Sequence, residues 1–324
     1  MVYFKLEFSL GKKNKCESKT NPTTDEPIGW DVVKTEVEQA RRDGRFKTAT
    51  NYLTAVRSWT QFVQTDRWRF SSMTSTTLER YQRWLGGRGL CLNTVSAYLR
   101  SLRTLYHKAI SDCRLPDEYD PFRRVFTGRA KTMKRSIPEE SILQLSRLEL
   151  PAGSSLCLAR DIFLFSFYAM GMPFVDVAYL KKNNLKDGLI CYARHKTGQP
   201  VRVSIEQPLL DIINRYMRDS SDFVFPILSS SSPAQLNKQY QNALRRYNYH
   251  LRRLSTMIDV PRPLSSYVVR HSWASLAYQH HVDVSMIGRA LGHTKSSTTL
   301  LYIRELFDPD LASANRKLME DIGL

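Results

Sequence analysis

Four polar side chains near the end of the sequence have the types and the spacing that chemistry on a phosphodiester requires. Arg270 and His271 are followed by His293 in the string LGHTKSSTTLLYIREL, and Tyr302 comes nine positions after His293. An arginine can grip two phosphate oxygens at once, because its guanidinium is a planar fork of donors. A tyrosine hydroxyl titrates near about pH 10, so neighbouring positive charge or a base must help it to lose its proton. The pattern predicts Tyr302 as a nucleophile that Arg270 and His293 stabilise.

A lysine further upstream is placed to supply the acid of the same reaction. Phosphoryl transfer needs a nucleophile, cations on the non-bridging oxygens and a proton for the leaving oxygen. Lys196 stands in the string HKTGQPV, in a turn between two short β-type runs at 189–193 and 201–205. From such a turn it can reach a groove and protonate a departing 5′ hydroxyl. A lysine on a turn is more often simply solvated, so this role depends on the other motifs.

The charge balance points to a polyanionic partner. The 324 residues include 48 Lys and Arg against 31 Asp and Glu, which gives a formal charge of +17 and a pI near 9.7. Nucleic acid is the usual partner of such a chain, although a ribosome-associated or membrane-surface protein shows the same excess. No apolar run is long enough to span a membrane, and Lys5 and Glu7 interrupt the apolar start. We expect no membrane association and a cytoplasmic location in a bacterium.

Cysteines and carboxylates give no sign of a cofactor or metal. The five cysteines are scattered, odd in number and free of any CxxC pair, which disfavours a disulfide framework and a zinc site. The motifs hold no carboxylate cluster with metal-ligand spacing, as a metal-dependent nuclease or transposase would require. We expect neither cofactor nor metal, since arginine, lysine and histidine can supply the charge.

Hydrophobic periodicity divides the chain into four parts. Residues 1–29 are polar and turn-rich and are expected to form a flexible arm, with a short strand possible near its start. Residues 30–120 carry apolar residues at spacings of three and four, which predicts four helices. Residues 121–137 hold six basic residues and no acid and are expected to be a linker, and residues 138–324 form a larger mixed domain. In that domain the sequence predicts the hairpin around Lys196 and helices at 139–148, 157–169, 174–182, 206–218, 234–257, 265–280, 284–291, 297–306 and 309–321.

Basic residues of the first domain and of the linker are candidates for contacts with DNA phosphates. Any single arginine on a helix is more often just solvated, but the set is not well explained that way. Each phosphate that they neutralise would increase the salt dependence of binding. The candidates are Arg57, Arg100, Arg103, Arg123, Arg124, Arg129, Lys131, Lys134 and Arg135.

Three motifs match the tyrosine recombinase (phage-integrase) family in their order along the chain and in their spacing, and they make the chain similar to that family: HKTGQPV, SYVVRHSWAS and LGHTKSSTTLLY. The resemblance covers nearly the whole length and implies a mainly α fold: an all-α, SAM-like core-binding domain, then a mostly helical catalytic domain with a small antiparallel sheet. It implies cleavage and rejoining of double-stranded DNA through a 3′-phosphotyrosyl link, without ATP or Mg²⁺. It also implies a homotetramer on two DNA sites, with a monomer or dimer off DNA.

The same resemblance assigns roles to individual residues. It implies that Tyr302 is the nucleophile, that Lys196 is the general acid, that Arg270 holds the scissile phosphate and that His293 donates to it. His271, beside Arg270, is expected to support the site rather than to touch DNA. The strings SYVVRHSWAS and GMPFVDVAYLKK are similar to the Bacteroidetes branch of the family, which includes promoter invertases and integrases of mobile elements.

Two positions depart from the family pattern. Tyr267 stands where the family has a histidine, one helical turn before Arg270 and His271, so its hydroxyl can donate a hydrogen bond but is a poor base near neutral pH. Pro173 stands where the family's first arginine is expected, two residues after a glycine in a "TGLR" type of string. Proline suits the first turn of a helix but offers a phosphate nothing.

Another residue is therefore expected to replace the lost cation, unless the site works with fewer. Arg160 is the first candidate, because it precedes the same helix pair, and Lys181 and Arg194 are further ones. Arg160 could instead pair with Asp161 or Asp176.

The sequence also allows other functions and assemblies. The segment after Tyr302, LASANRKLMEDIGL, predicts a short helix. The resemblance implies that this helix reaches into the catalytic domain of a neighbouring protomer and links four protomers in a ring, and docking on its own domain is the alternative. A relaxing, topoisomerase-like enzyme would share the chemistry but not the domain order. A catalytically impaired DNA-binding regulator or architectural protein of the same fold would explain Pro173 and Tyr267, but not the retention of the other four site residues.

Overall fold

The computed structural model describes residues 28–113, 120–130, 136–229, 232–293, 298–299 and 319–320, with no side-chain detail for 110–113. The chain forms two compact units, residues 1–131 and 132–324. Each unit has its own hydrophobic core, as the clusters of buried residues show. The expected class, mainly helical with a small antiparallel sheet, is confirmed.

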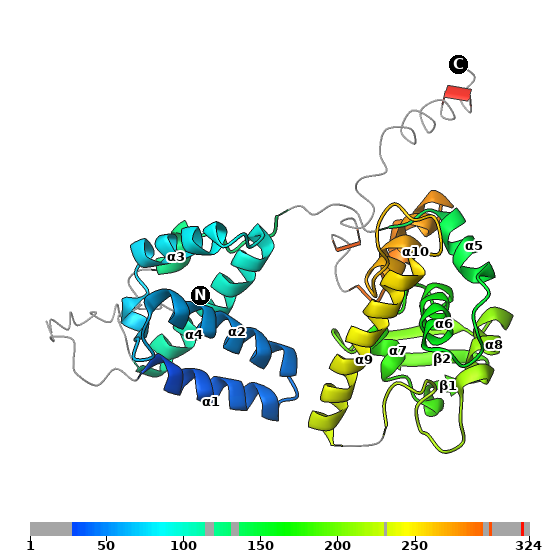
Figure 1. Cartoon of the computed structure of the whole chain (residues 1–324), viewed down its shortest axis with the longest axis horizontal. Coiled ribbons are helices and arrows are strands. Elements are labelled where there is room, and N and C mark those ends of the chain that lie inside the picture. The colour runs from blue at the N-terminus through cyan, green and yellow to red at the C-terminus, as the bar shows by residue number, and fades with distance from the viewer. Residues whose placement is uncertain are drawn as a thin grey trace, which may run out of the picture. The chain divides into compact units, whose positions relative to one another are not determined.

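Unit 1 is a bundle of helices (Figure 1). Aromatic side chains contribute much of its core. Trp59 is fully buried and meets the ring of Tyr81 edge-on, with 5.1 Å between centroids. Beside it, the Thr60 hydroxyl accepts hydrogen bonds from the indole N–H groups of Trp30 at 3.1 Å and Trp68 at 3.0 Å. Trp30 and Trp68 thus contribute large apolar areas and satisfy their indole N–H groups at the same time. The helices are α1 (Gly29–Arg42), α2 (Phe46–Val63), α3 (Ser75–Gly87) and α4 (Leu92–Cys113), with a 3₁₀ turn at Phe70–Ser72.

The first part of the expected linker is folded onto unit 1. Residues Pro121–Arg124 form a 3₁₀ turn, and Phe122 lies in the core of the unit. Asn93 of α4 exchanges two hydrogen bonds with the backbone of Ala130, at 2.9 and 3.0 Å. Nearby, the Ser96 hydroxyl donates to the Gly128 carbonyl at 2.6 Å. The sequence of residues 121–137, which is basic and flanked by prolines, did not reveal these tertiary contacts.

Unit 2 is built around the helix α6 (Ser155–Tyr168), which packs against five other helices. Its sequence SLCLARDIFLFSFY has apolar residues on all sides, as expected of a helix that is surrounded by protein. Ser154 begins it by accepting from the backbone N–H of Cys157 at 3.1 Å. The surrounding helices are α5 (Glu139–Arg147), α7 (Phe174–Ala178), α8 (Gln207–Tyr216), α9 (Pro233–Leu254) and α10 (Val268–Gln279).

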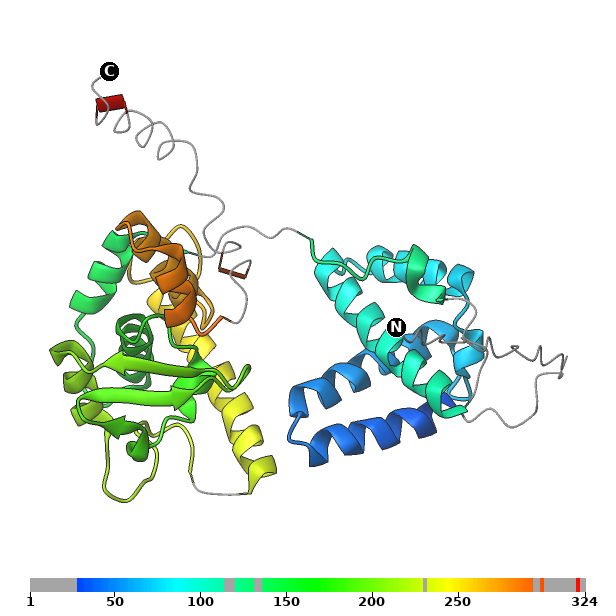
Figure 2. The same cartoon turned by 180° about the vertical axis from the view of Figure 1, so that it is seen from behind.

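A three-stranded antiparallel sheet lies beside these helices (Figure 2). The expected hairpin is β2 (Leu189–Ala193) with β3 (Pro200–Ser204), and Ile190 and Val203 are paired and buried. The strand β1 (Leu185–Lys186) was not expected, because two residues are too few to show an alternating pattern. The helix α7 ends at Ala178 rather than at 182, since Lys181 forms a bridge to Phe223 instead.

The last described helix, α11 (Val284–Ala290), ends in a tight turn that matters for the site. Gly292 has φ +62°, and the N–H of His293 bonds to the carbonyl of Gly288 at 3.0 Å. This is a glycine-terminated C-cap, in which a left-handed residue reverses the chain. No helix in the described parts of the chain is long and apolar enough to cross a membrane. The expected helices at 297–306 and 309–321 and the possible strand near the start lie almost wholly outside the described residues.

Candidate active site

Arg270 is buried at the first turn of α10, with 6% of its surface exposed. Its Nη1 donates to the carbonyl oxygen of Gly171 at 3.1 Å, and its Nη2 donates to the carbonyl of Leu291. Gly171 has φ +72°, and a Cβ there would lie 3.2 Å from the Cα of Arg270. The guanidinium thus connects α10 to the turn before α7 and to the turn after α11.

The imidazole of His293 lies against this guanidinium. Its Nε2 is 3.3 Å from Nη2 of Arg270, and its Nδ1 is 2.9 Å from the hydroxyl oxygen of Thr299. Because a guanidinium only donates, Nε2 accepts from Arg270, and the proton is on Nδ1, which donates to Thr299. Burial lowers the pKa of His293 to about 4, and the positive charges of Arg270, Arg194 and Lys196 add to this effect. The histidine is therefore neutral near pH 7.

A second buried arginine enters the same place from the sheet. Arg194 directly follows β2, and its Nη1 donates to Oδ2 of Asp176 at 2.7 Å. A Cβ on Gly292 would lie 2.8 Å from Cγ of Arg194, so the arginine stem crosses the turn that leads to His293. Burial raises the pKa of Asp176, while the charge of Arg194 opposes that rise.

Lys196 is exposed on the turn that Arg194 begins. The backbone N–H of Arg194 bonds to Gln199 at 2.8 Å, and its carbonyl accepts from Gly198 at 2.8 Å. The neighbouring His195 donates its backbone N–H to Asp176 at 2.9 Å and stacks its ring on Tyr179, with 5.0 Å between centroids. Asp176 thus holds the side chain of Arg194 and the backbone of His195, the two residues before Lys196. The positive charge of Lys196 contributes to the lowered pKa of His293.

Tyr267 and His271 lie at the start of α10. Their rings are 6.3 Å apart and tilted by 34°, as expected for two residues one helical turn apart. Tyr267 is 57% exposed and His271 is half-buried. The structure joins these two residues to each other, and their proposed supporting roles remain predictions.

Arg160, the first candidate for the missing cation, lies in a separate cluster. Its guanidinium binds the carbonyl of Leu148, and its Nε donates to Oδ1 of Asp161 at 2.8 Å. Arg215 and Tyr216 bind the other oxygen of Asp161, at 2.6 and 2.8 Å. Arg160 has therefore taken one of the two acidic partners that the sequence allowed, and none of these contacts links it to Arg270 or His293.

The other alternative cation is also used elsewhere. Lys181 lies over the ring of Phe223, with 5.8 Å from its Nζ to the ring centroid. This cation–π contact leaves Arg194 as the candidate that the structure brings to His293.

Several expected functional residues lie outside the described part of the chain. Tyr302 is one of them, as are Lys131, Lys134 and Arg135. Of the described candidates for DNA contact, Arg103 pairs with Asp120 at 2.6 Å and Arg124 lies 4.0 Å from Glu79. The exposed ones are Arg57, Arg100, Arg123, Arg124 and Arg129.

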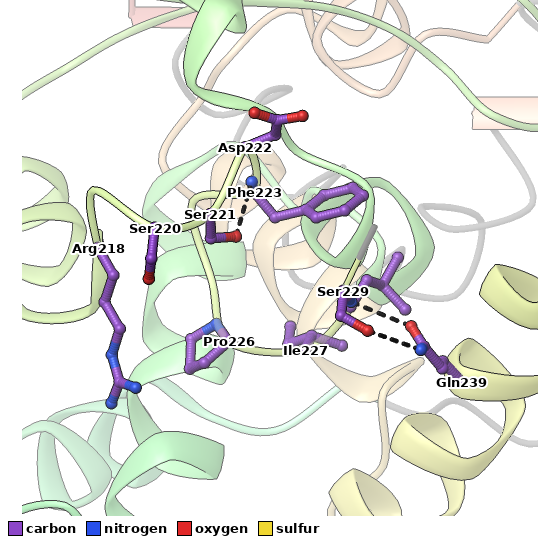
Figure 3. Close-up of a pocket in the computed structure, with 10 residues that line it drawn as sticks. Arg218, Ser220, Ser221, Asp222, Phe223, Pro226, Ile227, Ser229 and Gln239 are labelled. Atoms are coloured by element: carbon purple, nitrogen blue, oxygen red, sulfur yellow. Dashed lines mark hydrogen bonds between the residues drawn. The ribbon is translucent and has the colours of Figure 1, made fainter. Parts of the chain in front are cut away.

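A cavity of about 550 Å³ lies in another region of unit 2, between the end of α8 and the start of α9. Figure 3 shows Ser229 joined to Gln239 by two hydrogen bonds on one side and Arg218 extended on the other. Its lining includes none of the proposed site residues. Within the described ranges, no group of three or more His, Cys, Asp or Glu is placed to hold a metal ion.

Comparisons with known proteins identify the family. Residues 30–125 match the phage integrase SAM-like domain, and residues 141–308 match the phage integrase family, more than half of the 324-residue chain. The chain belongs to the phage integrase family of tyrosine recombinases. The resemblance drawn from the three motifs is thereby confirmed.

Similar proteins include tyrosine recombinases of bacteria and archaea. Tyrosine recombinase XerD of Ralstonia nicotianae is 22% identical over 269 residues, 72% of this chain and 85% of that protein. Tyrosine recombinase XerA of Pyrococcus furiosus is 27% identical over 181 residues, 54% of this chain and 58% of that protein.

Among solved structures, a lambda integrase dimer bound to a COC′ core site has a TM-score of 0.59 at 14% identity, over 84% of this chain and 94% of that one. A lambda integrase tetramer bound to a Holliday junction has a TM-score of 0.59 at 12% identity, over 86% and 78%. At such low identity these likenesses show the fold.

The sequence alone missed two parts of the site. Asp176 was considered only as a partner of Arg160, whereas it holds Arg194 and the backbone of His195. Thr299 was not considered, although it fixes the tautomer of His293. The available signal for Asp176 was an acidic residue in an apolar string, three residues after Pro173. Its partner Arg194 is 18 residues away along the chain, so the sequence did not reveal the pair.

Proposed function

We propose that this tyrosine recombinase cleaves and rejoins double-stranded DNA at specific sites through a 3′-phosphotyrosyl intermediate. One observation carries the proposal: Arg270 of α10, together with Arg194 and Lys196 of the turn between β2 and β3, acts on the imidazole of the half-buried His293. So much positive charge around a partly buried group favours an anionic ligand. Family membership and the formal charge of +17 support a phosphodiester as that ligand.

The residues divide the reaction between them. The hydroxyl of Tyr302 loses its proton to solvent, helped by the neighbouring positive charge. Its oxygen then attacks the phosphorus, an oxygen–phosphorus bond forms, and the bond from phosphorus to the 5′ oxygen breaks. Lys196 gives a proton to that oxygen. Arg270 binds the non-bridging oxygens, because charge in the transition state is held most effectively by preorganised donors. His293 donates to them from Nε2 once the bound phosphate, by offsetting the nearby cations, has raised its pKa and that nitrogen has taken up a proton. The new ester keeps the energy of the broken phosphodiester, so rejoining needs no ATP.

The partner and the assembly follow by analogy. The similar lambda integrase structures are bound to DNA, one of them as a tetramer on a Holliday junction. We infer a homotetramer on two DNA sites, with contacts from exposed basic residues of unit 1, and a monomer or dimer off DNA. The biological outcome would be inversion of a segment or integration and excision of a mobile element. Short inverted repeats in the neighbouring genomic DNA would favour inversion.

A covalent-trapping experiment tests the proposal. A library of nicked duplexes of randomised sequence is incubated with the protein, and DNA that stays attached in denaturing detergent is sequenced. We expect an adduct that disappears with Tyr302→Phe. Duplex binding without any adduct would contradict the enzyme and favour the alternative, a regulator of the same fold, for which Pro173 is the motivating departure.

A further inference from the structure

The turn in front of α7 lacks a cationic side chain where the chemistry calls for one. Pro173 begins this helix with φ −68° and ψ 151°, and its side chain has no donor. Arg270 contacts this turn through the carbonyl oxygen of Gly171, and both of its terminal nitrogens already bind backbone carbonyls. A second set of donors would bind the other non-bridging oxygen of a phosphate and strengthen its binding.

Arg194 brings a guanidinium to this same turn from a distant part of the chain. It is bound to Asp176, which lies three residues after Pro173 and therefore on the same side of the helical turn. The side chain of Arg194 is only 8% exposed, and its stem lies against Gly292, next to His293. Arg194 thus brings a positive charge to α7, the helix that Pro173 precedes.

The guanidinium of Arg194 also has N–H donors left to bind a ligand. Its Nε is buried and has no hydrogen-bond partner. A buried polar atom without a partner costs free energy, and native proteins keep few of them. The partners Asp176 and Tyr192 do not satisfy a group with five N–H donors. An anion placed near His293 would meet these donors.

We propose that Arg194 is the second guanidinium of the phosphate-binding site and takes the place of the arginine that is absent at position 173. Asp176 orients it, and its positive charge stabilises the non-bridging oxygens during cleavage. The proposal deepens the proposed function and rests on it. It gives Pro173 a structural explanation, because the cation comes from the sheet instead of from α7.

The principal variant removes both members of the ion pair, Arg194→Met together with Asp176→Asn, so that neither charge is left buried alone. Arg218→Met, at the cavity of Figure 3, is the matched control for loss of one arginine in the same unit. Melting temperature and duplex binding are recorded for each protein to show that it is folded. The substrate is the nicked duplex recovered with the wild-type protein, carrying either a phosphate or an uncharged methylphosphonate at the scissile position.

We expect the double variant to form adduct about 10²–10³-fold more slowly on the phosphate substrate, the usual effect of losing one preorganised donor. On the methylphosphonate substrate the deficit should shrink, because one negative charge no longer needs a partner. Arg218→Met should match the wild type on both. An unchanged rate in the double variant, or an equal deficit on both substrates, would overturn the assignment. The assignment would also be overturned if Arg160→Ala lost adduct formation while the double variant formed adduct at the wild-type rate.

A second measurement separates this proposal from the proposed function. Binding of inorganic phosphate to the free protein, followed by phosphorus NMR, needs no DNA cleavage. The wild type and Arg218→Met should bind phosphate more tightly than the double variant. If the wild type forms no DNA adduct but this difference in phosphate binding is seen, the recombinase function fails while the site stands. Equal phosphate binding by all three proteins would refute the site itself.

Discussion

The Nη2 atom of Arg270 lies 3.3 Å from Nε2 of His293, and the same guanidinium binds the carbonyl oxygens of Gly171 and Leu291. One side chain therefore holds together three segments that are far apart in the sequence. Its donors are fixed before any ligand arrives, which lowers the reorganisation that the reaction requires. Deleting Arg270 would remove its charge and its fork of donors together, so a change of shape at constant charge is the sharper test of the fork.

Arg270→Lys keeps the positive charge and loses the fork. An ammonium cannot reach both carbonyls and the imidazole, since it is a compact group on a flexible stem. We expect adduct formation to fall about 10²–10³-fold and the free energy of unfolding to fall by about 1–3 kcal/mol, as buried carbonyls lose their donors. The measurements are covalent trapping on a nicked duplex and urea denaturation. Arg289→Lys, at an exposed position of α11, is the control, and undiminished adduct formation by Arg270→Lys would contradict the assigned role.

Gly292→Ala tests the close approach of Arg194 to the turn after α11. Gly292 has φ +62°, and an added Cβ would lie 2.8 Å from Cγ of Arg194. Gly188→Ala is a matched control, because Gly188 has φ +71° with nothing within 4 Å of an added Cβ. The backbone strain of about 1–2 kcal/mol should be common to both variants.

The two glycine variants should therefore differ in what the clash adds. We expect Gly292→Ala to be the less stable of the two by urea denaturation, and to be the one that forms adduct more slowly, because Arg194 must move. Equal stability and equal adduct formation would show that Arg194 does not depend on this turn.

Local signals in the sequence predicted most of the helices. The apolar spacing around Trp59 and in 155–168 reports burial directly, since a helix repeats every 3.6 residues. Gly198 and Pro200 marked the turn of the hairpin around Lys196, because these residue types favour turns. The strand β1 was missed because a two-residue strand is defined by its partner β2 and not by its own pattern.

The pairing of charged residues was less predictable. Arg160 precedes Pro173 in the sequence and Arg194 follows it, but the sequence does not say which acid each arginine meets. Arg160 binds its neighbour Asp161, whereas Arg194 reaches Asp176 only because the sheet packs beside α7. Such pairs are set by tertiary contacts, so the sequence could name the candidates but not choose between them.

The ion pair of Arg194 and Asp176 should show strong coupling in stability. Both side chains are almost fully buried, at 8% and 1% exposure. Removing either one leaves an uncompensated buried charge, so Arg194→Met and Asp176→Asn should each lower the free energy of unfolding by about 3–5 kcal/mol. The double variant should lose less than the sum by about 0.5–3 kcal/mol. Denaturation of all four proteins gives this coupling energy, and additive losses would mean that the two charges do not stabilise each other.

The stability of unit 2 should depend on pH through His293. In the unfolded chain this histidine takes up a proton near its ordinary pKa of 6.5, whereas in the fold its pKa is about 4, through burial and the charges of Arg270, Arg194 and Lys196. Between these values the unfolded state binds more protons, so stability falls as the pH is lowered from 6.5 to 4 and is unaffected above 6.5. The imidazole is only half-buried, and after a discount for solvent screening we expect a loss of about 1 kcal/mol.

Urea denaturation at pH 7 and pH 5 of the wild type and of His293→Gln measures this contribution. Asp176 and His250 also titrate abnormally in the fold, but their effects are present in both proteins and cancel in the comparison. The wild type should lose more stability at pH 5 than the variant does. Inorganic phosphate should reduce that difference, because a bound anion offsets the three cations and raises the pKa of His293. Identical pH dependence of the two proteins would show that the cations do not act on this imidazole.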